Sequence, residues 1–331
     1  RIVAKVDELM ALCDRLEAEQ TDAEAAHARL VDALLAALTR STDAADFAAN
    51  WQRLAAHFDT LFTTEAAIDA LKQTILQLAV MGKLVPQDPN DEPASELLRK
   101  IESRKRMLAG DKIPRKKSQG YLPNQLQPIW GPPCGWAWSK LADLTEFVTD
   151  GEHATPQRTI DQSAVPLVTA KNVRDGFLDY TNTDFVPRNV AEKCWRRCKP
   201  ELNDILIVSV GATLGRLAIL NHHREMVIVR SVTLIRPCLV DVAYLALALR
   251  SPYVQKSIWG SVKQSAQPCL YLTQSSALNI PIPPAAEQHR IVAKVDELMA
   301  LCDRLKADLA TARQRQATLA DTLVAAALEA A

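Results

Sequence analysis

The sequence is poor in glycine and in aromatic side chains, and it carries no net charge. Ten glycines and 5% aromatics in a chain of 331 residues that is 48% hydrophobic favour extensive helix with one sheet-bearing domain. The balance of 39 basic and 39 acidic residues lacks the basicity of a stand-alone DNA-binding protein. No apolar run reaches the roughly 18 residues that span a membrane, and the opening lacks the layout of a signal peptide. We therefore expect a cytoplasmic protein.

Catalytic and metal-binding motifs are also missing. The seven cysteines are an odd, scattered set, which fits reduced cytosolic thiols. Cys194 and Cys198 form one C-x3-C pair, but without a second ligand pair the zinc signal is weak. The segment VGATLGR lacks the Gly-Lys-Ser/Thr ending of a phosphate loop, and the six histidines show no metal-ligand spacing. We expect no metal and no catalytic site in this chain.

The feature that dominates the sequence is an internal repeat. The 16 residues RIVAKVDELMALCDRL at Arg1 to Leu16 recur unchanged at Arg290 to Leu305. Further matches at the same offset of 289, such as Leu30 with Leu319, extend the repeat to a whole helix.

Apolar residues in both copies alternate at spacings of four and three, which is the heptad seam of a coiled coil. Each helix needs a partner, and we expect the two copies to pair with each other as an antiparallel coiled coil. The seam residues are Ile2, Val6, Leu9, Cys13 and Leu16 in the first copy and Ile291, Val295, Leu298, Cys302 and Leu305 in the second.

Composition divides the chain into four segments. Residues 1–84 form a helical region, whose first 80 residues hold 7 basic and 13 acidic residues, a net charge of −6. Residues 85–120 form a linker and a basic helix, which is either a solvated face or a phosphate-contacting one. Residues 121–289 form a mixed globular domain, and residues 290–331 form the distal helix. The predicted fold class is therefore α+β, with one mixed domain flanked by long helices.

Local patterns predict several elements within these segments. Helices are expected at 46–61, 65–81 and 242–249, and strands at 165–169, 205–210, 217–220 and 226–235.

Three polar loops of the globular domain carry side chains suited to reading a DNA duplex. Arg and Lys pair with guanine edges, Asn and Gln pair with adenine edges, and a loop so rich in donors is too polar to bury unpaired. Each loop alone could be plain surface, but three on one domain favour a recognition surface. The predicted DNA-binding residues are His153, Thr155, Gln157, Arg158, Lys171, Asn172, Arg174, Lys263, Gln264 and Ser265. A basic cluster that could bind phosphates, or equally be a solvated face, comprises Arg188, Lys193, Arg196, Arg197 and Lys199.

The order helix, globular domain and same helix again resembles the specificity subunit of type I restriction-modification systems. The resemblance extends through the stretches LKQTILQ, GWAW, DGEHATP, VPLVTAKNVRDG and YLTQSSALNIPIPPAAEQHRIVAKVDEL, which together cover nearly the whole chain.

The resemblance implies a non-catalytic DNA-recognition subunit. Two target-recognition domains of that family each read half of a split site, and conserved helices between them form a spacer that docks adenine methyltransferase subunits. The restriction and translocation subunit joins for cleavage, and S-adenosylmethionine is expected only on the methyltransferase. With one globular domain, this chain is expected to lack the first recognition domain and to read a half-site, with a homodimer through the helices as a possible assembly. The competing interpretation is a coiled-coil adaptor that binds protein and no nucleic acid.

Overall fold

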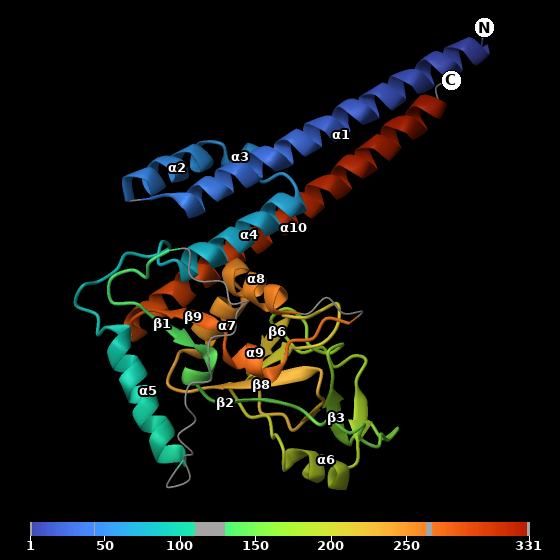
Figure 1. Cartoon of the computed structure of the whole chain (residues 1–331). Coiled ribbons are helices and arrows are strands. Elements are labelled where there is room, and N and C mark those ends of the chain that lie inside the picture. The colour runs from blue at the N-terminus through green and yellow to red at the C-terminus, as the bar shows by residue number, and fades with distance from the viewer. Residues whose placement is uncertain (1, 43, 110–129, 263–266, 330–331) are drawn as a thin grey trace. The chain divides into compact units, whose positions relative to one another are not determined.

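The structure is a computed structural model that describes residues 2–42, 44–109, 130–262 and 267–329. It divides into two compact units. The first, helical unit joins Arg1–Ile75 to Asp296–Ala331, and the second, globular unit is Leu76–Val295. Figure 1 labels most of the elements of both units. No helix in the described part of the chain is long and apolar enough to span a membrane.

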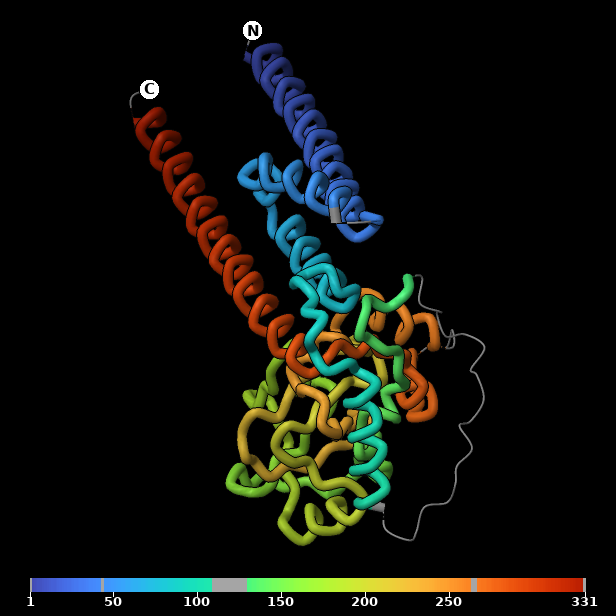
Figure 2. Tube along the Cα trace, turned by 90° about the vertical axis from the view of Figure 1, so that its left-hand side faces the viewer, coloured from blue at the N-terminus to red at the C-terminus, as the bar shows by residue number. Residues whose placement is uncertain are grey.

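The helical unit begins with a helix of 39 residues, as the repeat predicts. Its elements are α1 (Ile2–Arg40), α2 (Ala44–Ala56), α3 (Phe58–Leu61) and parts of α4 (Glu65–Val80) and α10 (Ala285–Glu329). In Figure 2, α10 runs as one unbroken tube, whereas the chain turns back after α1 into α2. The single helix predicted over 46–61 is interrupted at His57, where α2 gives way to α3.

The second half of α1 is covered by the helices that follow it. Val31, Leu35 and Leu38 are buried on this half. The side-chain amide of Asn50 in α2 donates to Ser41 Oγ at 3.0 Å, and His27 Nε2 lies 3.0 Å from the carbonyl oxygen of Thr60. The α2–α4 segment therefore folds back as a cap on this part of α1.

Helix α4 lies antiparallel along the second copy of the repeat. Three ion pairs fix the register, because they join α4 positions in ascending order to α10 positions in descending order. They are Glu65 with Arg313 at 3.7 Å, Asp69 with Lys306 at 2.5 Å, and Lys72 with Asp303. The repeat predicts instead that the first copy, in α1, packs along the second copy in α10.

The two predicted seams are consequently in different states. In α10, Ile291, Val295 and Cys302 are buried, and Leu298 and Leu305 are half-buried. In α1 the five matching residues are all exposed, namely Ile2, Val6, Leu9, Cys13 and Leu16. The copies do not cover each other within one chain, since α4 supplies the surface against the second copy.

The globular unit is a mixed α/β domain, and its described residues form three small sheets. Their strand orders are β1-β9, β2-β8-β5-β6 and β4-β3-β7. The strands are β1 (Ala137–Lys140), β2 (Thr145–Asp150), β3 (Val165–Val168), β4 (Asp184–Val186), β5 (Ile205–Val208), β6 (Leu217–Ile219), β7 (Val227–Ile228), β8 (Val232–Pro237) and β9 (Asn279–Ile282). The helices are α5 (Ala94–Ala109), α6 (Arg188–Trp195), α7 (Val242–Arg250), α8 (Pro252–Ser261) and α9 (Leu272–Ser276), with a 3-10 turn at Leu141–Asp143.

The core of this unit joins two of the sheets. Fully buried aliphatic side chains from β3, β5, β7 and β8 form one cluster, which includes Val168, Leu206, Ile228 and Leu234. The strand predicted over 226–235 is in fact two strands. Residues 229–231 interrupt it because β7 pairs with β3, whereas β8 pairs with β2 and β5. The chain therefore changes sheet at this point.

The first and last strands of the domain pair with each other. β1 and β9 are antiparallel, with Ala137 opposite Ile282. Buried polar groups reinforce this closure: Trp136 Nε1 donates to Glu287 Oε2 at 2.9 Å, and the Tyr244 hydroxyl donates to the carbonyl oxygen of Pro281 at 2.7 Å. Burial raises the pKa of Glu287, although the hydrogen bond from Trp136 opposes this shift. The segment that leaves the domain is thus built into its core.

Gly151 lies so close to the backbone of Ile228 that no side chain would fit there. A Cβ there would lie 2.1 Å from the carbonyl oxygen of Ile228. We expect Gly151→Ala to destabilise the globular unit by about 1–3 kcal/mol, because the two strands must separate. Calorimetric unfolding of the full chain measures this, with Gly260→Ala as the control, since its Cβ would meet nothing within 4 Å. Equal unfolding temperatures for the two variants would show that a Cβ at position 151 is tolerated.

Candidate nucleic-acid interface

The predicted recognition loops gather at one end of the strands. β2 and β5 both run antiparallel to β8, and Asp150 and Val208 at their ends lie opposite Thr233 and Val232 near its start. β3 runs parallel to β7, so these two strands end on the same side as each other. We call the segments that continue from these strand ends the loop edge, which comprises residues 150–158, 169–176, 209–213 and 229–231.

Backbone hydrogen bonds tie the segments of the loop edge together. Arg230 N donates to the Glu152 carbonyl at 3.0 Å, and Ser209 N donates to the Ser231 carbonyl at 2.9 Å. Val229 N reaches the carbonyl of Val168 at 3.3 Å. Loops that are distant in sequence therefore hold one another in position, and their outward side chains belong to one surface.

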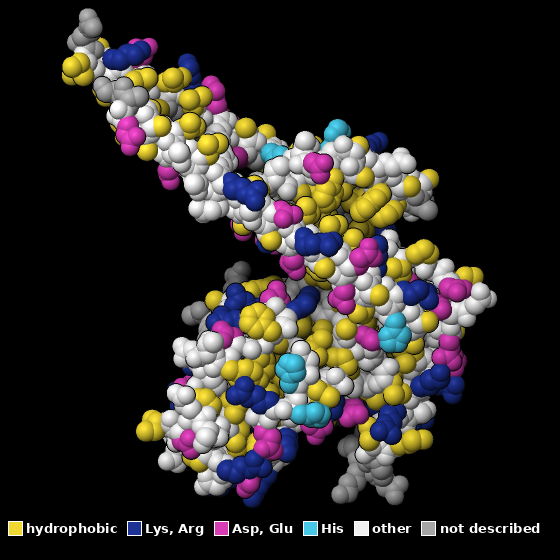
Figure 3. Space-filling view, turned by 180° about the vertical axis from the view of Figure 1, so that it is seen from behind, with side chains coloured by type: hydrophobic (Ala, Val, Ile, Leu, Met, Phe, Trp, Pro, Cys, Tyr) yellow, Lys and Arg dark blue, Asp and Glu magenta, His cyan; other side chains and the backbone are white. Residues whose placement is uncertain are grey.

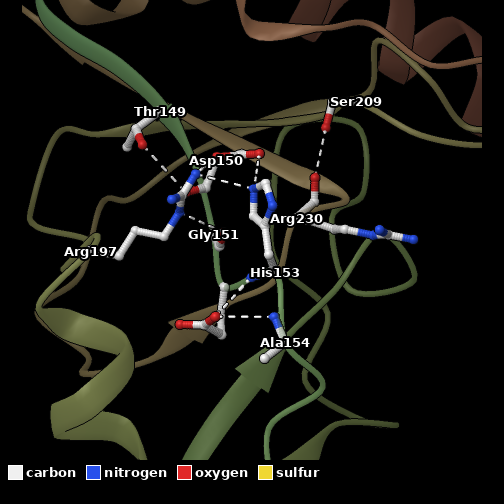
Figure 4. Close-up of polar contacts among 9 residues, drawn as sticks. Thr149, Asp150, Gly151, His153, Ala154, Arg197, Ser209 and Arg230 are labelled. Atoms are coloured by element: carbon white, nitrogen blue, oxygen red, sulfur yellow. Dashed lines mark hydrogen bonds and ion pairs between the residues drawn. The ribbon is translucent and has the colours of Figure 1, made fainter.

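His153 is held on the loop edge by an acidic neighbour (Figure 4). Its Nε2 lies 2.6 Å from Asp150 Oδ2, and the side chain is 57% exposed. Arg197, from the turn after α6, pairs with the same carboxylate and donates from Nε to the Gly151 carbonyl at 3.1 Å. Burial alone would raise the pKa of Asp150, but the hydrogen bonds from Arg197 and His153 outweigh it, so the net shift is downwards. The imidazole is thus presented to solvent by a partly buried carboxylate.

Arg158 and Lys171 converge on one carboxylate from two different loops. Arg158 lies 3.4 Å and Lys171 3.2 Å from Asp184 Oδ2, at the start of β4. Both cations are about half exposed. This pairing places two predicted DNA-binding side chains side by side, in contact with solvent.

The remaining described positions divide into exposed residues and one buried residue. Thr155 and Gln157 are exposed on the first loop, and Arg174 is exposed while pairing with Asp179 at 3.2 Å. Lys263, Gln264 and Ser265 lie outside the described residues. The backbone that flanks them is anchored on the loop edge, because Gly211 N donates to the Pro268 carbonyl at 2.9 Å and Leu270 N to the Ser209 carbonyl at 2.8 Å.

Asn172 is not available for base contact, and its assignment is corrected. Its side chain is buried, and its Oδ1 accepts from Thr169 N at 3.0 Å. Its Nδ2 donates to the Asp179 carbonyl at 3.0 Å and to Thr183 Oγ1 at 2.9 Å. The residue ties the second loop to the segment before β4, so it shapes the loop edge from within.

Arg230 is a loop-edge residue that sequence reasoning missed. Its backbone occupies the change of sheet between β7 and β8, and its side chain is exposed. No carboxylate pairs with it among the residues the structure describes. The sequence analysis predicts one strand over 226–235 and therefore does not single out Arg230. The only local signal is that Arg230 and Ser231 interrupt an apolar stretch.

The basic cluster around α6 does not act as one free cationic patch. Arg188 and Lys199 both pair with Glu225, and Arg197 turns back to Asp150. Lys193 and Arg196 remain exposed. Cys194 and Cys198 are buried, and burial raises the pKa of Cys198 to about 12, which keeps it a protonated thiol.

Comparison with known proteins identifies the family. Residues 133–311, which include the whole loop edge, match the family described as the type I restriction modification DNA specificity domain. The chain belongs to this family of specificity proteins. The match begins before β1 and ends within α10, so the family domain comprises the sheets together with the start of the second repeat helix.

Two relatives of this specificity family match along nearly the whole chain. The EcoAI specificity subunit of Escherichia coli is 36% identical over 343 residues, and the EcoEI specificity subunit of Escherichia coli is 35% identical over 341 residues. Each alignment covers 99% of this chain and 56% of the relative, so the chain spans just over half their length. The crystal structure of the HsdS subunit from Thermoanaerobacter tengcongensis superposes with a TM-score of 0.40 and 18% identity, over 74% of this chain and 51% of that one.

Because the Asn172 side chain is buried, its structural role in the loop can be tested separately from a contact with DNA. We expect Asn172→Ala to lower the free energy of unfolding by about 1–3 kcal/mol, because it leaves buried donors and acceptors unpaired. The neighbouring exposed change Lys171→Ala should alter it by less than about 0.5 kcal/mol. Chemical denaturation of both variants compares them, and a stable Asn172→Ala protein would return that side chain to the list of candidate contacts.

Proposed function

We propose that this chain recognises a half-site of a DNA target on behalf of a type I restriction-modification complex. The observation that carries the proposal is the loop edge: a family DNA specificity domain in which loops from four strand ends present Arg, Lys, His, Thr and Gln side chains on one surface. These are the side-chain types that pair with base edges and phosphates.

The electrostatics of the loop edge favour sequence reading over tight non-specific binding. Arg158, Lys171 and Arg174 are each paired with an aspartate in the free protein. Contact with DNA exchanges these exposed ion pairs, which are individually weak, for bonds to phosphate or base. With a chain pI near 7.1, much of the affinity has to come from partner subunits.

The partners that this function requires are an adenine methyltransferase and, for cleavage, the restriction and translocation subunit. The acidic helical region, with its net charge of −6 over residues 1–80, suits protein docking better than DNA contact. S-adenosylmethionine then belongs to the methyltransferase, and the complex works in the cytoplasm. Calorimetry that detects micromolar S-adenosylmethionine binding by the chain alone would assign the methyl donor here instead.

The proposal is tested by co-expressing the chain with the methyltransferase subunit of its own operon in a host that lacks adenine methylation. Long-read sequencing then maps the modified adenines. We expect a defined motif, palindromic and split if two copies assemble. A stable complex that modifies nothing would show docking without recognition, and an oligonucleotide selection that enriches no motif would favour the protein-binding adaptor.

Individual contacts are tested by Arg158→Ala and Lys171→Ala in the methyltransferase complex. If either side chain reads a base, we expect about a tenfold loss of affinity for the cognate site and relaxed choice at one position. If it binds phosphate, all sequences weaken alike and the salt dependence falls. Arg188→Ala is the matched control, because it removes the same charge at the opposite end of β4. An equal loss with Arg188→Ala would place the DNA elsewhere.

Without a covering helix, the exposed seam of α1 also favours self-association of the isolated chain through its helices. We expect light scattering to show a mass that rises with concentration, and Leu9→Asp to suppress the rise, because Leu9 is 50% exposed on the seam. A strict monomer at high concentration would count against a homodimer.

A further inference from the structure

The two copies of the repeat have one sequence and two different environments. Ile291 and Cys302 in α10 are 0% and 1% exposed, whereas the identical Ile2 in α1 is 82% exposed and Cys13 is also exposed. Since 16 identical residues encode the same seam, the first copy has the surface that the second copy uses, but without its cover.

The cover of the second copy shows what such a seam accepts. Helix α4 lies antiparallel along α10 and buries Ile68, Leu71 and Ile75. Its charged residues flank the apolar contact. Asp69 and Glu65 pair with the basic Lys306 and Arg313 of α10, and Lys72 pairs with Asp303.

Beyond the identical stretch, the first copy reverses two of these charges. Asp14 matches Asp303, but Glu17 stands where α10 has Lys306, and Glu24 stands where it has Arg313. A helix with the charges of α4 would keep the lysine pair with Asp14 and set Asp69 and Glu65 against two glutamates. Like charges at such spacing disfavour the contact.

We propose that the first half of α1 is a docking face for one amphipathic helix from outside residues 1–331, with the apolar pattern of α4 and the opposite charge at two positions. Its lysine matches Lys72, and basic residues replace Asp69 and Glu65. The occupant is thus a second α4-like helix of defined polarity, and the α4 of a second copy is a poor fit.

The end of α10 supports the same occupant. By the repeat offset, Val324 matches Leu35, yet Val324 is 60% exposed and Leu35 is 3% exposed. Leu35 lies on the half of α1 that the α2–α4 segment covers. The apolar residues left open near the end of α10 are Leu319, Leu323, Val324 and Leu328. In Figure 3, hydrophobic side chains lie on the surface along both long helices. The open seam of α1 and the open end of α10 are therefore the two places that a second α2–α4-like segment would cover.

Two synthetic peptides test the charge rule on the full chain. The first has the sequence of residues 62–83, and the second, the reversed peptide, carries Glu65→Arg and Asp69→Lys. Fluorescence anisotropy of labelled peptides measures their affinities. We expect the reversed peptide to bind about tenfold more tightly, because two like-charge contacts become two ion pairs.

Cysteine alkylation locates the binding site. Cys13 lies in the middle of the open seam and is exposed, whereas Cys302 is buried and burial raises the pKa of its thiol. We expect the reversed peptide to slow alkylation of Cys13 by iodoacetamide, read by mass spectrometry, and to leave exposed Cys134 of the globular unit unchanged.

A reciprocal change in the chain completes the test. Glu17→Lys with Glu24→Arg should reverse the preference, so that the wild-type peptide binds about tenfold more tightly than the reversed one. The control is Glu8→Lys with Asp22→Arg, which makes the same change in net charge at exposed positions that are not three or four residues away from any seam residue. This control should leave the preference as it was.

Four results would overturn the proposal. Equal affinities for the two peptides, or no binding by either, would remove the charge rule. A preference of the unaltered chain for the wild-type peptide would make the α4 of a second copy the occupant. Binding that leaves Cys13 as reactive as before would place the peptide elsewhere.

Discussion

The pairing of β1 with β9 is the constraint on which the arrangement of the chain depends. Because these strands are antiparallel, the globular domain begins and ends at the same place, and α10 can start within four residues of the last strand. The buried Glu287 and Gln288 fix that start, since Gln288 Oε1 accepts from Asp241 N at 2.9 Å and its Nε2 donates to the Pro283 carbonyl at 3.1 Å. Arg290, the first residue of the repeat, is then held by Asp91. In the order of the chain, the domain is thus an insertion between two helical segments.

The sequence predicted the features that depend on local pattern or repetition. The repeat predicted two long helices, and strands at 165–168, 205–208 and 217–219 follow from short apolar runs between turns. The loops could be predicted because they are too polar to bury. That they lie together at one edge depends on the order of the strands, which cannot be predicted from local sequence. Three points failed for the same reason. The change of sheet at 229–231, the burial of Asn172 and the place of α4 beside the second repeat are all set by contacts between residues far apart in sequence.

Under the proposed function, a nearly neutral loop edge has to discriminate between DNA sequences. Asp184 holds Arg158 and Lys171 together, and Asp150 holds His153 with Arg197, so the cations are positioned before any ligand arrives. Exposed pairs of this kind contribute little to stability, and most of their effect lies in fixing where the side chains point. The same aspartates disfavour phosphates that approach out of register. Under the proposed function, such a surface gains selectivity and gives up non-specific affinity.

The reversed charges around an unchanged seam follow a similar logic in the helical unit. Apolar residues at heptad spacing accept many partners, and two identical copies in one chain could exchange covers. The residues immediately after the identity, Glu17 in one copy and Lys306 in the other, are the first that can tell the copies apart. The charge at each of two matched positions, Glu17 with Lys306 and Glu24 with Arg313, either attracts or repels the charged residues that flank an α4-like helix. Two such positions are enough to direct two similar helices to different copies of the repeat. The seam supplies affinity, and the flanking charges decide which helix it receives.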